Sequence, residues 1–336
     1  MSASKQILQK IAQANRGRGL LRKNDSILIA LSGGADSTAL LWALSKLKRK
    51  YRLRLAAAHL DHGLQEAQSL SFSKHAEDIS KKFETPFYSK KVRVGALAKK
   101  YKRSLEETGR IERYRFFLEV AAKTGCRKIA TAHTLDDQAE TLLLRLIRGS
   151  GLRGLSGIPY RRREGRAWLI RPLLLCRKKE LLAALKENHI SFCVDPTNRD
   201  DFFTRNRVRS RLLPLLERSF NPKIKESLSG LQAACSEAQD FIEKKAHTAF
   251  KNCLAKKISK QKISLRLDRL KPLHRAIQSE VFSLALMATK GDLKQFTHRH
   301  LADLESLLDS PESNLRLSLP KVRIHKTRLT LDFFYN

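Results

Sequence analysis

The sequence lacks the cysteine patterns that build a metal or disulfide site. Its 336 residues include five cysteines, an odd number, and no two of them are spaced as Cys-x-x-Cys. These features give no support for a zinc ribbon, a disulfide framework or a thioredoxin-like centre. A secretory apolar segment is also missing, so the pattern is typical of the reducing cytoplasm, which is the localisation we expect.

Long apolar runs and N-terminal acidic residues are absent as well. No stretch approaches the roughly 18 apolar residues of a membrane-spanning helix, so we expect no such span. Residues 1–24 contain no Asp or Glu, which suits either a transit peptide or a short basic helix that leads into the first strand. We favour the helix, because cleavage would leave little chain before that strand.

Acidic residues are scarce along the whole chain. There are 67 Lys and Arg residues against 33 Asp and Glu residues, which gives a net charge of +34. Such an excess favours a polyanionic partner through counterion release, with nucleic acid first and an anionic membrane surface second. Hydrophobic residues make up 42% of the chain, enough for a packed core, and the length suits one large domain or two.

The first two thirds of the chain alternate apolar strands with helices. Strands are predicted at residues 27–31, 53–60 and 126–132, and a helix follows each of them. This alternation favours an α/β fold with a parallel sheet, whose ligands gather at the carboxyl ends of the strands. Polar clusters follow all three strands, at residues 32–37, 59–62 and 133–137. The sequence therefore predicts one active site at this edge of the sheet.

A domain boundary is predicted near residues 221–222, where the alternation stops. We expect a catalytic domain over residues 1–217 and a smaller, mainly helical domain over residues 218–336. Helices are predicted at 223–254, 275–289 and 297–308, followed by short extended segments at 315–319, 322–325 and 329–333. Before the boundary we expect a basic loop at residues 161–163 and an edge strand at residues 168–175.

The turn at residues 32–37 reads Ser-Gly-Gly-Ala-Asp-Ser and joins the first strand to a helix. Backbone N–H groups and the positive end of a helix dipole meet in such a turn, which favours phosphate. The turn lacks the lysine of a Walker A loop. Its pattern resembles the pyrophosphate loop of the N-type ATP pyrophosphatases, which cleave ATP between the α and β phosphates. The alternative is an ordinary turn capped by Ser or Asp.

Charged and imidazole side chains form further candidate sites, each with an alternative interpretation. Arg110 and Arg113 share one helix face, where they either bind phosphate or carboxylate or pair with glutamates in solvent. Asp136, Asp137 and Glu140 lie within about one turn, where they either cap a helix or bind Mg²⁺ or an ammonium group. The histidines at 59, 62 and 133 suggest zinc, without a supporting ligand pattern. The arginines at 205–211 suit either a surface helix or a phosphate-binding loop.

A glycine pattern at residues 149–154 matches G-x-G-x-x-G. The dinucleotide fingerprint must follow a strand and open a helix, whereas this one follows a helix, so we reject a Rossmann site.

Taken in order, these segments resemble the tRNA(Ile)-lysidine synthetases, whose catalytic domain is an adenine-nucleotide alpha-hydrolase-like PP-loop ATPase. Beyond the loop, the resemblance rests on H-x-x-H-G-L at 59–64, E-x-x-x-R-x-x-R-Y at 106–114, A-H-x-x-D-D-Q-A-E-T at 132–141, R-G-S-G-x-x-G-L-x-G-I-P at 148–159, R-P-L-L at 171–174, and D-x-T-N-x-D followed by R-N-R-x-R at 195–209. Thr134 and Gln65 depart from the family pattern. The remainder resembles the family's first C-terminal domain, and the second is expected to be missing.

The resemblance implies a two-step reaction on tRNA(Ile) with a CAU anticodon. ATP adenylates the 2-carbonyl oxygen of the wobble cytidine, and the ε-amine of free L-lysine then displaces AMP to give lysidine. This modification changes the charging identity of the tRNA from methionine to isoleucine. ATP and Mg²⁺ are the implied cofactors, tRNA and lysine are the implied partners, and the resemblance also allows a homodimer.

The resemblance also implies roles for individual residues. The pyrophosphate would be held by Ser32, Gly33, Gly34, Ala35, Asp36 and Ser37, with Mg²⁺ at Asp36. His59 would face adenine, while Arg110 and His133 would contact the phosphates. Arg113 would bind the lysine carboxylate. The lysine amines would meet Asp36, Asp137 and Glu140, of which Asp137 is the favoured proton acceptor. Arg205, Arg207 and Arg153 would contact the substrate or the tRNA.

Three other functions share parts of this pattern. A tRNA thiolase carries the same loop, but sulfur transfer usually needs paired cysteines, which the chain lacks. An amidotransferase-type synthetase needs a nucleophilic N-terminal cysteine or a glutaminase domain, and neither is visible in the sequence. A basic RNA-binding protein with an inactive loop is the third alternative.

Overall fold

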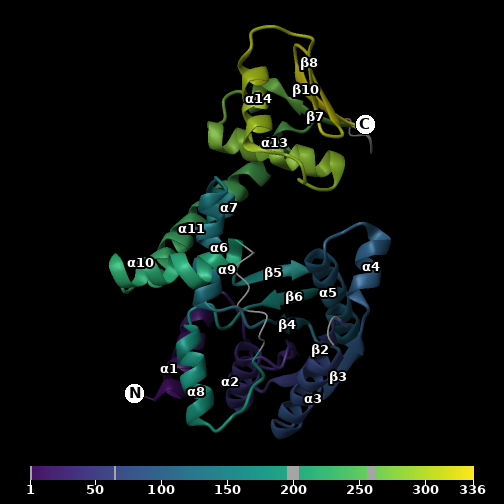
Figure 1. The fold of residues 1–336 in the computed structure, drawn as a ribbon. Helices are drawn as coiled ribbons and strands as arrows, with labels where there is room; N and C mark the ends of the chain where they lie inside the picture. Colours follow the sequence, from purple (N-terminus) through teal and green to yellow (C-terminus); the bar gives the residue numbers. More distant parts are fainter. Residues whose placement is uncertain (1, 64–65, 195–203, 256–261) are drawn as a thin grey trace. The chain divides into compact units, whose positions relative to one another are not determined.

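The computed structural model describes residues 2–63, 66–194, 204–255 and 262–336. The chain divides into two units by its internal contacts (Figure 1). Unit 1 comprises residues 1–148 and 157–231, and unit 2 comprises residues 149–156 and 232–336. The contact-based division thus falls inside a long helix, and a short segment from the first part of the chain joins unit 2. The functional boundary at residues 217/218 stays a prediction.

Unit 1 contains a six-stranded sheet of order β3-β2-β1-β4-β6-β5, in which only β5 runs antiparallel to its neighbour. Its strands are β1 (Ser26–Ala30), β2 (Arg54–Asp61), β3 (Phe87–Lys91), β4 (Lys128–Ala130), β5 (Arg161–Glu164) and β6 (Ala167–Ile170). The parallel α/β fold predicted from the sequence is confirmed. Leu28 and its neighbours Ile27 and Ile29 are fully buried, because helices cover both faces of the strand.

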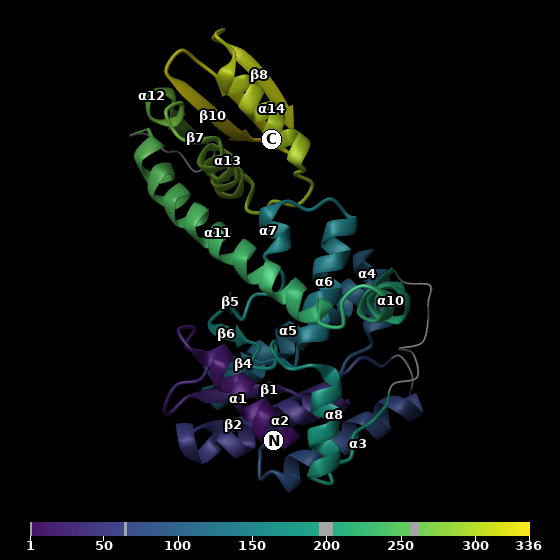
Figure 2. The ribbon, with the colours of Figure 1, turned by 90° about the vertical axis from the view of Figure 1, so that its left-hand side faces the viewer.

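Helices pack on both faces of this sheet (Figures 1 and 2). Ile27 and Ile29 join a core with α1 (Ala3–Asn15), α2 (Ala35–Tyr51), α3 (Glu66–Lys82) and α8 (Lys178–Glu187). Leu28 points to the opposite face, where it joins a core with α5 (Leu105–Thr124). Each buried aliphatic side chain contributes about 1.5–3 kcal/mol. The favoured N-terminal helix is present as α1, which buries Ile7 and Ile11.

The prediction for the arginine-rich segment at residues 161–163 is wrong. These residues form edge strand β5 rather than a loop, and β6 lies inside the sheet between β4 and β5. Gly165, with a φ of +54°, turns the chain back between the two strands. The arginines are accommodated because Arg161 and Arg163 stack on the Trp168 ring, at 5.1 and 5.5 Å from its centroid.

Unit 1 contains further helical elements that pack on one another and on α5. They are α4 (Val94–Tyr101), α6 (Leu135–Ile147), α9 (Thr204–Arg207), the π-helix η2 (Val208–Leu212) and α10 (Leu213–Ser219). Helix α4 is not predicted from the sequence. The arginines at 205–211, for which the sequence leaves a helix and a loop open, lie in α9 and in the π-helical turn that follows it.

Unit 2 combines helices with a four-stranded antiparallel sheet of order β7-β10-β9-β8. Its elements are α7 (Leu152–Leu155), α11 (Ile224–Cys253, which begins in unit 1), β7 (Lys262–Arg266), α12 (Leu267–Leu270), α13 (Arg275–Lys290), α14 (His298–Asp309), β8 (Leu315–Leu319), β9 (Val322–Lys326) and β10 (Thr330–Tyr335). Phe282 of α13, Leu304 of α14 and Phe333 of β10 share its core. The sequence analysis predicts the three long helices and the last three strands but misses β7.

Arg153 joins the segment at residues 149–156 to the rest of unit 2. Its guanidinium pairs with Glu280 on α13 and, at 3.1 Å, with Glu243 on α11. Burial raises the pKa of Glu280, and Arg153 lowers it. The side chain predicted to contact tRNA is therefore held by two carboxylates of its own unit. In the described part of the chain, every helix is too short or too polar to cross a membrane.

Replacing Arg153 by Ala is expected to destabilise unit 2. The substitution leaves the largely buried Glu280 without its cation, which costs about 1–3 kcal/mol. Urea unfolding followed by circular dichroism measures the loss, and adding Glu280→Gln should restore most of it. An Arg153→Ala variant as stable as the parent chain would contradict this anchoring role.

Candidate active site

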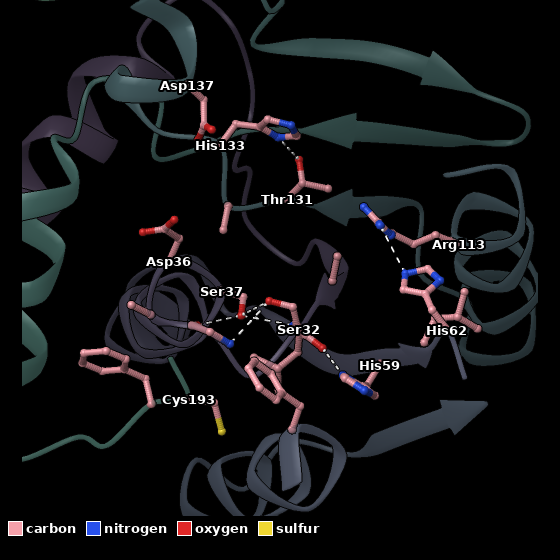
Figure 3. Close-up of a pocket in the computed structure, with 18 of the residues that line it drawn as sticks. Ser32, Asp36, Ser37, His59, His62, Arg113, Thr131, His133, Asp137 and Cys193 are labelled. Atoms are coloured by element: carbon pink, nitrogen blue, oxygen red, sulfur yellow. Dashed lines mark hydrogen bonds between the residues drawn. The ribbon is translucent and has the colours of Figure 1, made fainter. Parts of the chain in front are cut away.

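A cavity of about 890 Å³ opens at the carboxyl ends of β1, β2 and β4 (Figure 3). All three polar clusters predicted from the sequence contribute to its wall. The predicted site residues that line it are Ser32, Gly34, Ala35, Asp36, Ser37, His59, Arg110, Arg113, His133 and Asp137. Gly33 and Glu140 lie in contact with this wall, whereas Arg153 belongs to unit 2.

The turn between β1 and α2 is closed by its own serines. The Ser37 hydroxyl donates to the Gly34 carbonyl at 3.0 Å and accepts from the Ser32 amide at 3.1 Å. Gly33 has a φ of +84°, and a Cβ there would lie 2.9 Å from the Phe72 carbonyl oxygen, so only glycine fits. Helix α2 starts after Gly34, which has no side chain to cap it. This geometry disfavours the alternative of a Ser- or Asp-capped turn and leaves amide donors for an anion.

Asp36 is the acid of the site with the most perturbed ionisation. Its Oδ1 is buried and finds no hydrogen-bond partner among the described residues. Burial raises the pKa of Asp36 to about 6, with Lys178 lowering it and Asp137 raising it. The Lys178 ammonium lies 3.7 Å from Oδ2. Asp36 is therefore mostly ionised at neutral pH yet poorly compensated.

This environment fits Mg²⁺. The ion binds proteins through one or two carboxylates and completes its octahedron with phosphate oxygens and water. Within the described ranges, no three His, Cys, Asp or Glu side chains come together as a metal cluster. A single orphaned carboxylate oxygen beside a phosphate-binding turn suits a metal that arrives with its nucleotide.

Asp137 and Glu140 are held by groups of the chain itself. Asp137 Oδ2 accepts from the Thr134 amide and hydroxyl, both at 2.9 Å, and closes the capping box of α6. Its Oδ1 pairs with Arg205 at 3.2 Å. Glu140 is 1% exposed and binds Arg209 at 2.6 Å and Arg205 at 3.0 Å. Arg205 and Arg209 therefore occupy the positions in which a cationic ligand would bind Asp137 and Glu140.

Thr134 departs from the family pattern, and its contacts give it a local role. It is the N-cap of α6, and its hydroxyl accepts from the Asp137 amide and donates to the Asp137 carboxylate. Threonine is a good N-cap residue. The second departure, Gln65, and the D-x-T-N-x-D segment at 195–200 lie outside the described residues.

The three histidines of the site are neutral at pH 7. Burial lowers the pKa of His59, and lowers those of His62 and His133 to about 4. His59 Nδ1 contacts the Leu31 carbonyl at 2.9 Å, so this nitrogen carries the proton and Nε2 is an acceptor. His133 Nδ1 contacts the Thr131 hydroxyl at 3.0 Å. Neutral imidazoles donate or accept hydrogen bonds here rather than supplying charge.

His62 orients Arg113. The arginine Nη2 donates to His62 Nε2 at 3.2 Å, and a neutral ring is required to accept this bond (Figure 3). The sequence analysis considers His62 only as a zinc ligand. Lys178, which lines the cavity, is not predicted from the sequence, whereas Arg209, which also lines it, is one of the arginines at 205–211 that the sequence singles out. Arg207, one of the predicted substrate contacts, is exposed and bonds the Thr204 hydroxyl.

Comparisons with known proteins agree with this geometry. The family model described as PP-loop domain matches residues 2–216, so the chain is a PP-loop protein. The chain is 34% identical over 319 residues to the tRNA(Ile)-lysidine synthase of Clostridioides difficile, with 94% of this chain and 67% of that protein covered. It is 32% identical over 314 residues to the enzyme of that name from Caldanaerobacter subterraneus, with 94% and 66% covered.

The chain belongs to the tRNA(Ile)-lysidine synthase family, as the sequence motifs predict. It spans about two thirds of the length of these relatives. Among solved structures, the U34-tRNA thiolase NcsA from Methanococcus maripaludis is similar, with a TM-score of 0.56 and 18% identity over 69% of this chain and 78% of that one. This likeness supports the fold alone.

The pKa of Asp36 predicts the pH dependence of nucleotide use. If the ionised carboxylate is required, kcat/KM for ATP should rise from about pH 5 to about pH 7 with a midpoint near 6, and then level off. Pyrophosphate release measured across this range tests it, and Asp36→Asn should give low, pH-independent rates. A flat profile for the parent chain would show that Asp36 ionisation does not matter.

Thr134→Ala should destabilise the start of α6. The variant loses both hydroxyl bonds of the capping box, which costs about 1 kcal/mol of unfolding free energy. Thr134→Ser keeps the hydroxyl and is the matched control in urea unfolding. Equal losses in the two variants would assign the effect to the missing methyl group instead of the cap.

Proposed function

We propose that the chain catalyses ATP-dependent formation of lysidine at the wobble cytidine of tRNA(Ile) with a CAU anticodon. The observation that supports this most is the convergence of three groups in one cavity of a lysidine synthase family member. These groups are the turn at residues 32–37, the Asp36 carboxylate with its unpartnered Oδ1, and the guanidinium of Arg113 that His62 orients. The turn suits the phosphates of a nucleotide, Asp36 suits the amino groups of a free amino acid, and Arg113 suits its carboxylate.

The proposed nucleotide site begins at α2. The α2 amides and the Ser32 hydroxyl face the phosphates, and the unprotonated Nε2 of His59 accepts from the adenine amino group. Arg110 and the neutral His133 add donors to the phosphate oxygens. Mg²⁺ would be held by Asp36 and would offset the charge of the departing pyrophosphate. Cytidine O2 attacks the α-phosphorus, and the bond to the oxygen that bridges α and β breaks.

The proposed lysine site lies around Arg113, whose guanidinium takes the carboxylate in bidentate geometry. The amino groups then meet Asp36, because Asp137 and Glu140 already bind arginines. As the ε-nitrogen bonds to C2 of the cytidine, AMP leaves and a proton must be accepted. Asp36 is better placed for this than Asp137, whose two oxygens both accept hydrogen bonds. We therefore propose Asp36 as the proton acceptor in place of Asp137.

The tRNA is proposed to bind through the basic surface. A charge of +34 suits a phosphate backbone. Arg205 and Arg207 are both exposed on α9, and Arg205 pairs with the cavity residue Asp137, so this short helix suits contact with the tRNA. A thiolase has less support, since Cys193 is the only cysteine among the described residues that line the cavity.

The decisive assay combines ATP, labelled lysine and a tRNA with a CAU anticodon. We expect label in the tRNA and none with a CAC anticodon. Asp36→Ala and Arg113→Ala should each abolish incorporation, while tRNA affinity stays within about twofold because neither side chain is proposed to bind the backbone. Arg115→Ala, on the same helix and paired with Glu112, is the matched control and should retain activity.

Other outcomes would contradict the proposal. Label from sulfide instead of lysine in the tRNA would favour the thiolase. Tight tRNA binding without pyrophosphate release would favour a non-catalytic RNA-binding protein. Loss of tRNA affinity in Asp36→Ala would remove the assigned role of that carboxylate.

A further inference from the structure

The phosphate-binding turn carries no lysine, but the fold brings one to it. A Walker A loop supplies its own lysine to the outer phosphates. Here residues 32–37 contain none, and Lys178 is the only lysine among the described residues of the cavity wall. It is the first residue of α8, far along the chain from the turn.

The position of Lys178 is fixed by its backbone and by the helix that follows. Its amide donates to Asp136 Oδ2 at 2.7 Å, at the start of α6. Helix α8 packs against α2 and buries Leu181 and Ala184 completely. The side chain itself is 46% exposed. The start of α8 therefore holds an ammonium group, paired only loosely with Asp36, beside the first turn of α2.

The electrostatic setting of Lys178 favours an anion. A cation in the first turn of a helix meets the positive end of the dipole, which is unfavourable unless an anion lies between them. The oxygen Asp36 Oδ2 lies 3.7 Å from Lys178 Nζ, which is too far for a hydrogen bond. The N-terminus of α2 adds further positive potential at the same place.

We infer that Lys178 binds the β and γ phosphates of ATP and the pyrophosphate product, an assignment that rests on the proposed cleavage between the α and β phosphates. As the bond from the α-phosphorus to the bridging oxygen breaks, negative charge grows on the pyrophosphate. An ammonium group fixed beside it stabilises this charge. Lys178 thus supplies the phosphate-binding ammonium group that the turn lacks. When the nucleotide binds, this ammonium group leaves Asp36 and pairs with phosphate oxygens.

Binding measurements on Lys178→Ala test this inference without requiring turnover. The backbone bond to Asp136 survives the substitution, so the start of α8 should stay intact. Calorimetry without tRNA, using ATP with Mg²⁺, inorganic pyrophosphate and AMP as separate probes, should show affinity losses of about tenfold or more for the first two and none for AMP. Lys178→Arg should retain part of the affinity. Lys179→Ala, the exposed neighbour, is the matched control and should bind all three like the parent chain.

Two results would overturn the inference. One is unchanged pyrophosphate affinity in Lys178→Ala. The other is recovery of pyrophosphate binding when Asp36→Asn is added to Lys178→Ala, because Lys178 would then act only by compensating Asp36. Failure of the proposed function would give a different result. The parent chain would then bind ATP and pyrophosphate but would not transfer lysine to tRNA, and the assignment of Lys178 would still hold.

Discussion

The start of helix α2 is the constraint on which the site depends. The chain leaves β1, turns at a glycine with positive φ, and enters the helix through a second glycine that cannot cap it. The serines of the turn bond mainly one another and the turn's own backbone. Backbone amides are left for a ligand, and the helix dipole makes that ligand an anion. The neighbouring strands end at the same edge, so the groups that follow them line the same cavity.

The acidic side chains of the cavity differ in how well nearby cations compensate their charge. Two acids of the site are neutralised by the chain itself: Glu140 pairs with Arg205 and Arg209, and Asp137 pairs with Arg205, more loosely with Arg209 at 3.8 Å, and caps a helix. Asp36 is the exception, with a loose lysine and a buried, unpartnered oxygen among the described residues. Uncompensated charge in a largely buried place costs stability. Its retention beside a phosphate-binding turn is best explained by a ligand that supplies the missing cation.

Much of this could be predicted from sequence, and the failures have physical causes. Ile27 and Leu28 show the strand because a fully buried strand needs an unbroken apolar run. The Ser-Gly-Gly turn predicts a phosphate-binding geometry because its chemistry is local. The strand that contains Arg161 and Arg163 is not predicted, because its charged residues are typical of a loop. Their stacking on Trp168 depends on the fold and cannot be inferred from their spacing in the sequence.

Long-range pairing explains the remaining differences at the site. Nothing near Asp137 in sequence shows that Arg205 will reach it, and nothing near Lys178 shows that it will stand beside Asp36. Likewise, the spacing of His62 suggests a metal ligand until the structure places Arg113 against it. Local patterns thus predict most of the residues that follow the three strands into the cavity, whereas Lys178 and the partners of each charge follow only from the fold.

The products of ATP test the central claim most directly. If the turn at residues 32–37 holds the pyrophosphate of a nucleotide cleaved between its α and β phosphates, ³¹P NMR of a reaction with lysine and CAU tRNA should show AMP and pyrophosphate in equal amounts. Their formation should depend on the tRNA. Production of ADP and inorganic phosphate, or nucleotide cleavage indifferent to the anticodon, would contradict the account.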